Sequence, residues 1–297
     1  MGIEGQPLAL LVNPSAGRGR TRDLLPQVES ELDKRRMVFR VEKTTSIEQA
    51  VGQALRAADA REVPVVMSGD GLLGAVGGAL AGTGTPMGII PGGRGNDLAR
   101  VLGIPQEPAE AVEILVTGHT REIDVGEANG RRFLGVASAG FDSEANRIAN
   151  ETRHVRGNLV YAYAALRALT AWKPARFTIQ EGERRMRFTG YTIAAANSKA
   201  YGGGMFIAPD ADLSDGELDV VMVGEVGKLR FLANLPKVFK GTHVEQDEVQ
   251  VFRARSVTLD ASRPFAVYAD GEHITDLPAT VRVLPGALQV VAPPAPA

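Results

Sequence analysis

Apolar runs of strand length alternate with helical stretches over the first third of the chain, and this alternation restricts the fold more than any other feature. The runs lie at Leu8–Val12, Val38–Val41, Val63–Met67 and Met87–Ile90. Between them, leucine and valine recur at helical spacing from Leu24 to Leu32, and Ser46 begins a second helix with Gln49 at the capping-box position. Strands that alternate with helices pair in parallel, with helices on both faces. The pattern predicts an N-terminal parallel α/β domain of Rossmann-like form.

Three loops that contain glycine follow the carboxyl ends of these runs. They read Asn13-Pro14-Ser15-Ala16-Gly17, Ser68-Gly69-Asp70-Gly71 and Pro91-Gly92-Gly93-Arg94-Gly95-Asn96-Asp97. Glycine lets the backbone approach a bulky ligand and turn its N–H groups toward it, and a helix N-terminus adds positive potential. Carboxylates at the same edge can hold Mg²⁺ directly or through water. The loops therefore predict a nucleotide phosphate site at the carboxyl edge of the sheet.

The pattern changes near Arg121, after which most apolar runs read as strands. These runs are Phe133–Ser138, Arg176–Gln180, Tyr191–Ala196, Leu218–Val223, Ser256–Leu259, Phe265–Ala269, Val281–Leu284 and Leu288–Val291. Helical insertions interrupt them at about residues 143–170 and 228–239. We predict an α/β domain over residues 1–124 and a mainly antiparallel β domain over residues 125–297, with the last strand region as a candidate to return to the first domain.

Composition narrows the classes of function. The 297 residues carry a net charge of −2, which gives no support for a nucleic-acid binder that relies on bulk positive charge. There is no Cys, which excludes disulfides, zinc–thiolate sites and cysteine nucleophiles and fits a reducing interior. The N-terminus lacks the pattern of a signal peptide, and no apolar run reaches membrane-spanning length. We therefore expect a cytoplasmic protein whose membrane contact, if any, is peripheral.

Seven motifs in order along the chain resemble those of the bacterial diacylglycerol kinase-like lipid kinases, which share a catalytic domain with sphingosine kinases and a fold with NAD kinases. The motifs are Asn13-Pro14-Ser15-Ala16-Gly17, Gly69-Asp70-Gly71, Pro91-Gly92-Gly93 with Gly95-Asn96-Asp97, Gly140-Phe141-Asp142-Ser143, Tyr201-Gly202-Gly203-Gly204, Ser214-Asp215-Gly216 and Asp270-Gly271-Glu272. The resemblance implies an NAD kinase-like two-domain fold, in which the second domain is β-sandwich-like and the nucleotide lies in the interdomain cleft. It also implies transfer of the ATP γ-phosphate to a lipid alcohol such as diacylglycerol.

The resemblance assigns roles to individual residues. The nucleotide would contact Asn13, Pro14, Ser15, Ala16, Gly17, Thr45 (or its neighbour Thr44), Ser68, Gly69, Asp70, Gly71, Gly93, Arg94 and Asn96. The base would be Asp270, with Glu272, Asp70, Asp97 and Asp124 in the same proton and metal network. A structural Mg²⁺ site is implied near Asp212, Asp215 and Glu217. The implied partner is a lipid alcohol at a membrane surface rather than nucleic acid, and a homodimer through an exposed strand edge stays open.

Asp270-Gly271-Glu272 also has an independent physical rationale. The motif follows an apolar run, so it would place two carboxylates on a tight turn at a strand end. A carboxylate in that position can orient an alcohol and accept its proton late in phosphoryl transfer. The same Asp-Gly pair is an ordinary hairpin signal, as is Asp215-Gly216, and Asp124 could equally be a solvated strand end.

The chain departs from the family pattern at several loop positions. Leu72 stands where the family usually has Thr, Ser68 replaces Gly, and Gly74 and Ala75 replace residues that are often Asn and Glu. A lost hydroxyl contact to a charged group costs about 1.5–3 kcal/mol. Arg94, at a position that is usually Thr, could restore a contact to phosphate, or it could fill the phosphate pocket.

Two further hypotheses therefore remain beside the lipid kinase. One is an NAD kinase-like phosphotransferase with a soluble substrate; the other is a catalytically weakened module that binds nucleotide or lipid. The helical stretch with Tyr161, Tyr163, Leu166, Leu169 and Trp172 is expected either to pack in the core or to line a lipid cleft.

Overall fold

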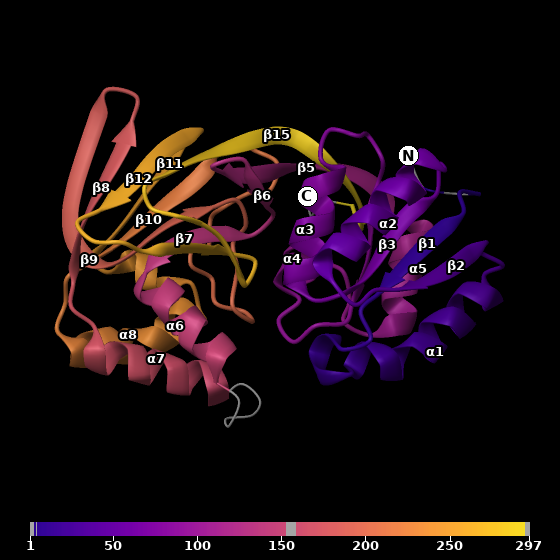
Figure 1. The fold of residues 1–297 in the computed structure, drawn as a ribbon, viewed down its shortest axis with the longest axis horizontal. Coiled ribbons are helices and arrows are strands. Elements are labelled where there is room, and N and C mark those ends of the chain that lie inside the picture. The colour runs from indigo at the N-terminus through magenta and orange to yellow at the C-terminus, as the bar shows by residue number, and fades with distance from the viewer. Residues whose placement is uncertain (1–2, 4, 153–158, 295–297) are drawn as a thin grey trace.

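The computed structural model describes residues 3, 5–152 and 159–294, which form two sheets joined by two long strands (Figure 1). The first sheet has four parallel strands in the order β2-β1-β3-β4. Its strands are β1 (Leu8–Val12), β2 (Phe39–Lys43), β3 (Val63–Ser68) and β4 (Gly88–Pro91). The four strands predicted from the apolar runs of the first domain, and their parallel pairing, are confirmed here.

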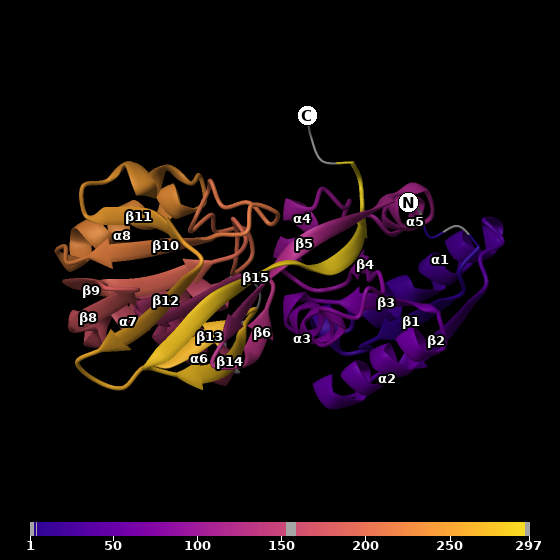
Figure 2. The same cartoon turned by 90° about the horizontal axis from the view of Figure 1, so that it is seen from above.

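Helices cover both faces of this sheet, as a parallel sheet requires. They are α1 (Arg20–Lys34), α2 (Ile47–Asp59), α3 (Asp70–Leu80), α4 (Asp97–Val101) and α5 (Pro108–Thr117), with a short 3₁₀ turn at Ala16–Arg18. α1 packs beside α5, and α2 packs beside α3 on the other face (Figure 2). Ser46 caps α2 as predicted, because its side chain accepts the backbone N–H of Gln49.

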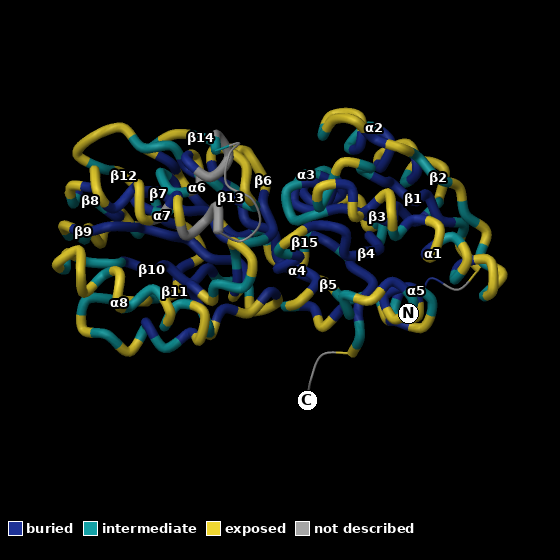
Figure 3. Tube along the Cα trace, turned by 90° about the horizontal axis from the view of Figure 1, so that it is seen from below, coloured by how far each residue is buried: buried dark blue, intermediate teal, exposed yellow. Residues whose placement is uncertain are grey.

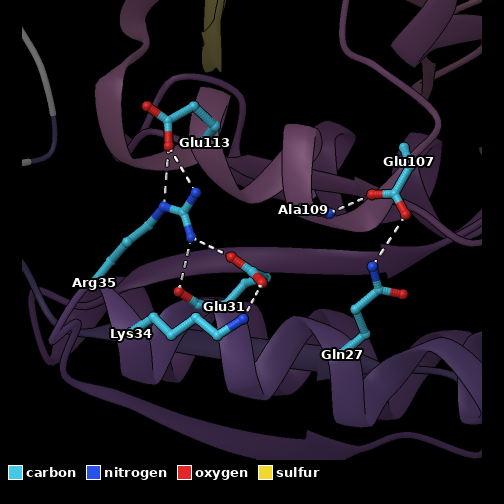
Figure 4. Close-up of polar contacts among 7 residues, drawn as sticks. All are labelled: Gln27, Glu31, Lys34, Arg35, Glu107, Ala109 and Glu113. Carbon is cyan, nitrogen blue, oxygen red and sulfur yellow. Dashed lines mark hydrogen bonds and ion pairs between the residues drawn. The ribbon is translucent and has the colours of Figure 1, made fainter.

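Polar contacts on the surface fasten α1 to α5 (Figure 4). Arg35 joins Glu31 on its own helix to Glu113 on α5, at 2.5 and 2.8 Å. Gln27 donates to Glu107, the residue that caps α5, at 3.0 Å. Exposed pairs of this kind contribute little individually, so most of the stability comes from the apolar layer beneath them.

The second sheet is antiparallel and has eleven strands. They are β5 (His119–Ala128), β6 (Arg131–Phe133), β7 (Val136–Gly140), β8 (Ala175–Glu181), β9 (Arg184–Ala196), β10 (Leu218–Gly224), β11 (Val249–Ala254), β12 (Ser256–Ala261), β13 (Ala266–Ala269), β14 (Glu272–Asp276) and β15 (Ala279–Ala292). Among the described residues, the helices that lie against it are α6 (Phe141–Glu151), α7 (Leu159–Ala171) and α8 (Lys228–Val238). A 3₁₀ turn at Thr242–Glu245 follows α8.

The structure corrects several strand predictions in this half. The run Phe133–Ser138 is not one strand, because the chain breaks at Leu134 and Gly135 between β6 and β7. The two runs after Ala279 form one strand, β15, whose pairing is irregular between Leu284 and Leu288. Strands β5, β11 and β14 were not predicted, because the polar residues within them leave no continuous apolar run of strand length.

Strands β5 and β15 run side by side from the β domain to the first sheet (Figure 2). Near its end, β15 bonds to the chain just before β4: Met87 donates to Gln289 and accepts from Val291, both at 2.9 Å. Buried residues follow the strands of both sheets (Figure 3), and the apolar core of the first domain includes Ile123 and Val125 of β5 and Leu288 and Val290 of β15. The two domains therefore share a strand pair that positions one against the other.

Candidate active site

A cavity of about 650 Å³ runs from the glycine loops of the first domain into the β domain. Its entrance is lined by the loops that follow β1, β3 and β4. The β13–β14 turn also lines the cavity, and the part lined by α6, α8 and the second sheet is called its inner part here. A single space therefore adjoins the predicted phosphate loops and an apolar interior.

The glycine loops touch one another through their backbones. Gly17 has a φ of +59°, and a Cβ there would lie 2.5 Å from the carbonyl oxygen of Gly92. A Cβ on Gly93 would lie 2.4 Å from the Cα of Gly69. Side chains at Gly17 and Gly93 would push the loops apart, so glycine is required for the close packing that forms the entrance.

The structure brings most of the predicted nucleotide residues to this cavity. Those that line it are Asn13, Ala16, Gly17, Thr45, Ser68, Gly69, Asp70, Gly71, Gly93 and Arg94. Pro14, Ser15 and Asn96 do not line it. Asn96 is buried beneath the second loop, where its side chain accepts the N–H of Gly93 at 2.8 Å. Thr44 is buried and bonds to Val12, so Thr45 is the threonine that faces the cavity.

Asp270 lies at the tip of the hairpin formed by β13 and β14. Asp270 and Gly271 have φ values of +52° and +87°, and they link Ala269 to its partner Glu272. Two consecutive residues with positive φ are the geometry of a two-residue hairpin turn, which Asp-Gly favours. The turn places the side chains of both Asp270 and Glu272 on the cavity lining.

The Asp270 carboxylate is held by backbone groups of the break between β6 and β7. It accepts the N–H groups of Leu134 and Gly135, each at 2.8 Å. A Cβ on Gly74 would lie 2.2 Å from its Oδ2, so the carboxylate packs against the glycine face of α3. Burial, opposed by these two hydrogen bonds and reinforced by nearby Asp70, raises the pKa of Asp270 to about 7.

Asp70 and Asp97 lie nearby, each at the first turn of a helix. Burial and the Asp97 charge raise the pKa of Asp70 to about 6, although Asp70 accepts the N–H of Leu98 at 3.2 Å. Burial also raises the pKa of Asp97, whose Oδ2 accepts the N–H of Gly203 at 2.7 Å. The Oδ1 of Asp97 is buried and has no hydrogen-bond partner. Three carboxylates of raised pKa thus gather where a cation would be favoured.

Asp124 lies elsewhere. Its side chain is buried, and its two oxygens accept the N–H groups of Gly216 and Gly286, both at 2.7 Å. It does not line the cavity. Its observed contacts fasten the 212–217 loop and the irregular part of β15 to β5, so the carboxylate positions these segments.

In the loop of residues 212–217, which was predicted to bind a metal, the carboxylates of Asp212 and Asp215 accept hydrogen bonds from residues of the same loop. Asp212 accepts from the backbone and side chain of Ser214, while Asp215 accepts the N–H of Glu217 and lies 3.6 Å from Arg253. None of these acidic residues lines the cavity, and metal binding by this loop stays a prediction. Within the described residues, no three His, Cys, Asp or Glu groups are arranged to hold a metal ion by themselves.

The residues around the orphaned Asp97 oxygen do fit a nucleotide-bound Mg²⁺. Such an ion takes one or two carboxylates and completes its shell with phosphate oxygens and water. Gly95 lies between the carboxylates of Asp70 and Asp97, since a Cβ there would be 3.1 Å from each. The Oδ2 atoms of the two carboxylates and the backbone of Gly203 thus face Gly95 from different sides.

Three features of the site were not recognised from the sequence. The backbone donors of Leu134 and Gly135 lie in a segment predicted as continuous strand, although a glycine inside a strand pattern is a signal for a bulge or break. Gly203, which holds Asp97, belongs to a motif to which no role was assigned. Asp142 is a further acidic residue of the lining, where its carboxylate accepts from Thr192 at 3.0 Å and Tyr201 at 3.4 Å.

The inner part of the cavity is apolar and aromatic. Phe141, Val226 and Phe231 line it, and Phe141 contacts Phe231 edge-on at 4.7 Å. Leu169 and Trp172 are buried behind them, whereas Tyr163 and Leu166 are exposed on α7. The predicted helical stretch is thus divided between core and surface; the side chain of Tyr161 lies outside the described residues.

Fold and site together define a two-domain kinase with an acidic, glycine-rich cleft between the domains. The comparisons with known proteins agree. Residues 7–128 match the model of the diacylglycerol kinase catalytic domain, and residues 135–292 match that of the YegS C-terminal NAD kinase beta sandwich-like domain. A diacylglycerol kinase of Mycobacterium tuberculosis is 38% identical over 95% of this chain and 94% of its own. The chain belongs to the diacylglycerol kinase family of lipid kinases.

More distant relatives extend this result. A diacylglycerol kinase of Bacillus subtilis is 26% identical over 91% of this chain and 90% of its own. A crystal structure titled as a putative diacylglycerol kinase from Bacillus anthracis superposes with a TM-score of 0.80 at 24% identity, covering 98% of both chains. That structure supports the two-domain fold. The predicted family and fold class are confirmed.

Proposed function

We propose that this protein transfers the γ-phosphate of ATP, in the presence of Mg²⁺, to the hydroxyl of diacylglycerol or a similar lipid alcohol. The observation that carries the proposal is a single cavity lined by the glycine loops, by Asp270 beside them and by apolar side chains of the β domain. Relatives named diacylglycerol kinase over nearly the whole chain support the substrate class.

The entrance suits a nucleotide triphosphate with its metal. Backbone N–H groups of glycine loops and the start of α3 favour phosphate. Arg94 is the only Lys or Arg among the described residues that line the cavity, so it is the candidate side-chain cation for phosphate. Asp70 and Asp97 would hold the Mg²⁺, which when bound neutralises phosphate charge.

Asp270 is proposed as the base. Its carboxylate is oriented by two backbone donors, and its pKa of about 7 leaves it able both to ionise near neutral pH and to accept a proton. In the reaction, the substrate oxygen would bond to the γ-phosphorus as the bond to the ADP oxygen breaks. The hydroxyl proton would pass to Asp270, and Glu272 would lie beside it at the same turn.

The apolar interior is proposed to take the acyl chains. Phe231, Leu235 and Val238 reach it from one side of α8, and Phe141 and Val223 reach it from α6 and the sheet. Transfer of acyl carbons into such a space is favourable by about 0.8 kcal/mol per buried methylene. The cavity thus offers a polar environment for the nucleotide phosphates and an apolar one for the acyl chains.

Because such a lipid resides in a bilayer, we propose peripheral contact with the cytoplasmic face of a membrane. Within the described residues, no helix is long and apolar enough to cross one. A homodimer through a strand edge stays a prediction, and sedimentation of the purified chain tests it.

The test is transfer of labelled γ-phosphate to diacylglycerol in mixed micelles with Mg²⁺, with Asp270→Asn as the matched variant. We expect the wild type to form phosphatidic acid and the variant to lose about 10²–10⁴-fold in rate while keeping its ATP affinity. A variant that retains a near-wild-type rate removes Asp270 from the role of base. A wild type that is folded and inactive on every lipid alcohol contradicts the proposed function.

A further inference from the structure

Helix α8 separates the apolar cavity from the surface of the β domain. None of its residues is buried, although Phe231, Leu235 and Val238 line the cavity. A helix with one side against a cavity normally presents polar residues on the other. The outer side of α8 departs from this rule.

The outer side of α8 is an apolar stripe. Leu229, Leu232 and Phe239 are 86%, 40% and 54% exposed, and Pro236 lies between them on the same side of the helix. On the neighbouring α7, Tyr163 and Leu166 are also exposed. Apart from Pro236, these residues account for five of the nine large exposed apolar side chains in the part of the chain that the structure describes. Such a gathering marks an interaction surface.

The charges carried by the α8 segment itself have one sign. The segment from Lys228 to Lys240 holds four cations, the others being Arg230 and Lys237, and no Asp or Glu. Arg230 pairs with Glu248, and Lys228 donates to the carbonyl of Thr170 at the end of α7, which joins the two helices below the sheet (Figure 1). Apolar side chains flanked by Lys and Arg are the composition of helices that lie in the interface of an anionic bilayer.

We infer that α8 is the docking element of this protein, and that its partner is an anionic phospholipid bilayer. The outer stripe enters the boundary of the acyl chains, and the surrounding cations meet the phosphates. The inner side of the same helix lines the apolar cavity, so docking places the cavity next to the lipid phase. This inference deepens the proposed function, since it rests on a lipid substrate for the same cavity.

The test is flotation of the full chain with vesicles of phosphatidylcholine containing about one third phosphatidylglycerol, in about 0.1 M NaCl, where charges act over about 10 Å. The variant is Leu229→Gln with Leu232→Gln, which removes apolar surface and retains good helix formers. The matched control is Val38→Gln, an apolar residue 71% exposed on the first domain. We expect the double variant to bind about tenfold or more weakly, and the control to bind as the wild type does.

Phosphate transfer to a short-chain, water-soluble diacylglycerol separates docking from chemistry. The double variant should keep the wild-type rate on this substrate and lose rate on vesicles. Equal vesicle binding by the wild type and the double variant overturns the inference. So does a double variant that loses as much transfer rate on the soluble diacylglycerol as it loses on vesicles. Equal binding to vesicles of pure phosphatidylcholine overturns the anionic partner. A wild type that binds vesicles through α8 but phosphorylates no lipid supports docking and contradicts the proposed function.

Discussion

Asp270→Asn should change how the stability of the protein depends on pH, independently of any assay of activity. The pKa of Asp270 is about 7 in the folded chain against an ordinary value of 3.8. Between these two values the folded state binds a proton that the unfolded state has released. Stability must therefore fall as pH rises through this window, because the unfolded chain ionises Asp270 freely whereas the desolvated cleft opposes its ionisation in the folded chain.

The magnitude follows from the same numbers. Between pH 5 and pH 8.5 the wild type crosses about two pH units of this window. Each unit corresponds to about 1.36 kcal/mol, so the free energy of unfolding falls by roughly 2–3 kcal/mol because of Asp270 alone. The asparagine variant does not titrate. It loses a hydrogen bond, because an amide accepts from only one of the two N–H donors of Leu134 and Gly135. That loss is the same at both pH values and cancels in the difference.

The assay is denaturant unfolding of both proteins at pH 5 and pH 8.5, without nucleotide and with chelator present. The wild type should lose roughly 2–3 kcal/mol more than the variant between the two conditions. Asp247→Asn, which removes an exposed carboxylate, serves as the control and should parallel the wild type. Parallel loss in Asp270→Asn and wild type would refute the burial argument.

Three further substitutions test other parts of the site. Arg94→Ala should weaken ATP binding about tenfold, as loss of a charge-assisted hydrogen bond does; tighter binding by calorimetry would identify Arg94 as an obstruction. Gly74→Ala should lower the rate of transfer at least about tenfold, since a methyl there meets the Asp270 carboxylate 2.2 Å away, whereas Gly227→Ala, with no atom within 4 Å of its new methyl, should not. Asp124→Asn should cost about 1–3 kcal/mol of stability, because one of its two buried backbone donors loses its acceptor; unchanged unfolding in denaturant would contradict the positioning role.

Local patterns in the sequence were sufficient for the first domain and for the Asp270 turn. Parallel strands buried on both faces leave continuous apolar runs, and loops at their carboxyl ends lie at one edge whatever the rest of the chain does. The turn at Asp270 and Gly271 is likewise a property of adjacent residues, because few other pairs adopt positive φ twice in succession. Strands with a polar face, such as β14, carried too little periodicity to be recognised.

The sequence by itself thus determined the elements, the glycine loops and the family. Only the tertiary structure decided which acidic residues lie together. Asp70, Asp97 and Asp270 meet because β13 pairs with β7 and brings its turn over α3, whereas Asp124 is directed to two backbone donors away from the cavity. Spacing along the chain does not encode such contacts, since they depend on the pairing of strands far apart in sequence. The two apolar sides of α8 likewise cannot be told apart from the sequence, because only the folded structure shows which of them lines the cavity and which is exposed.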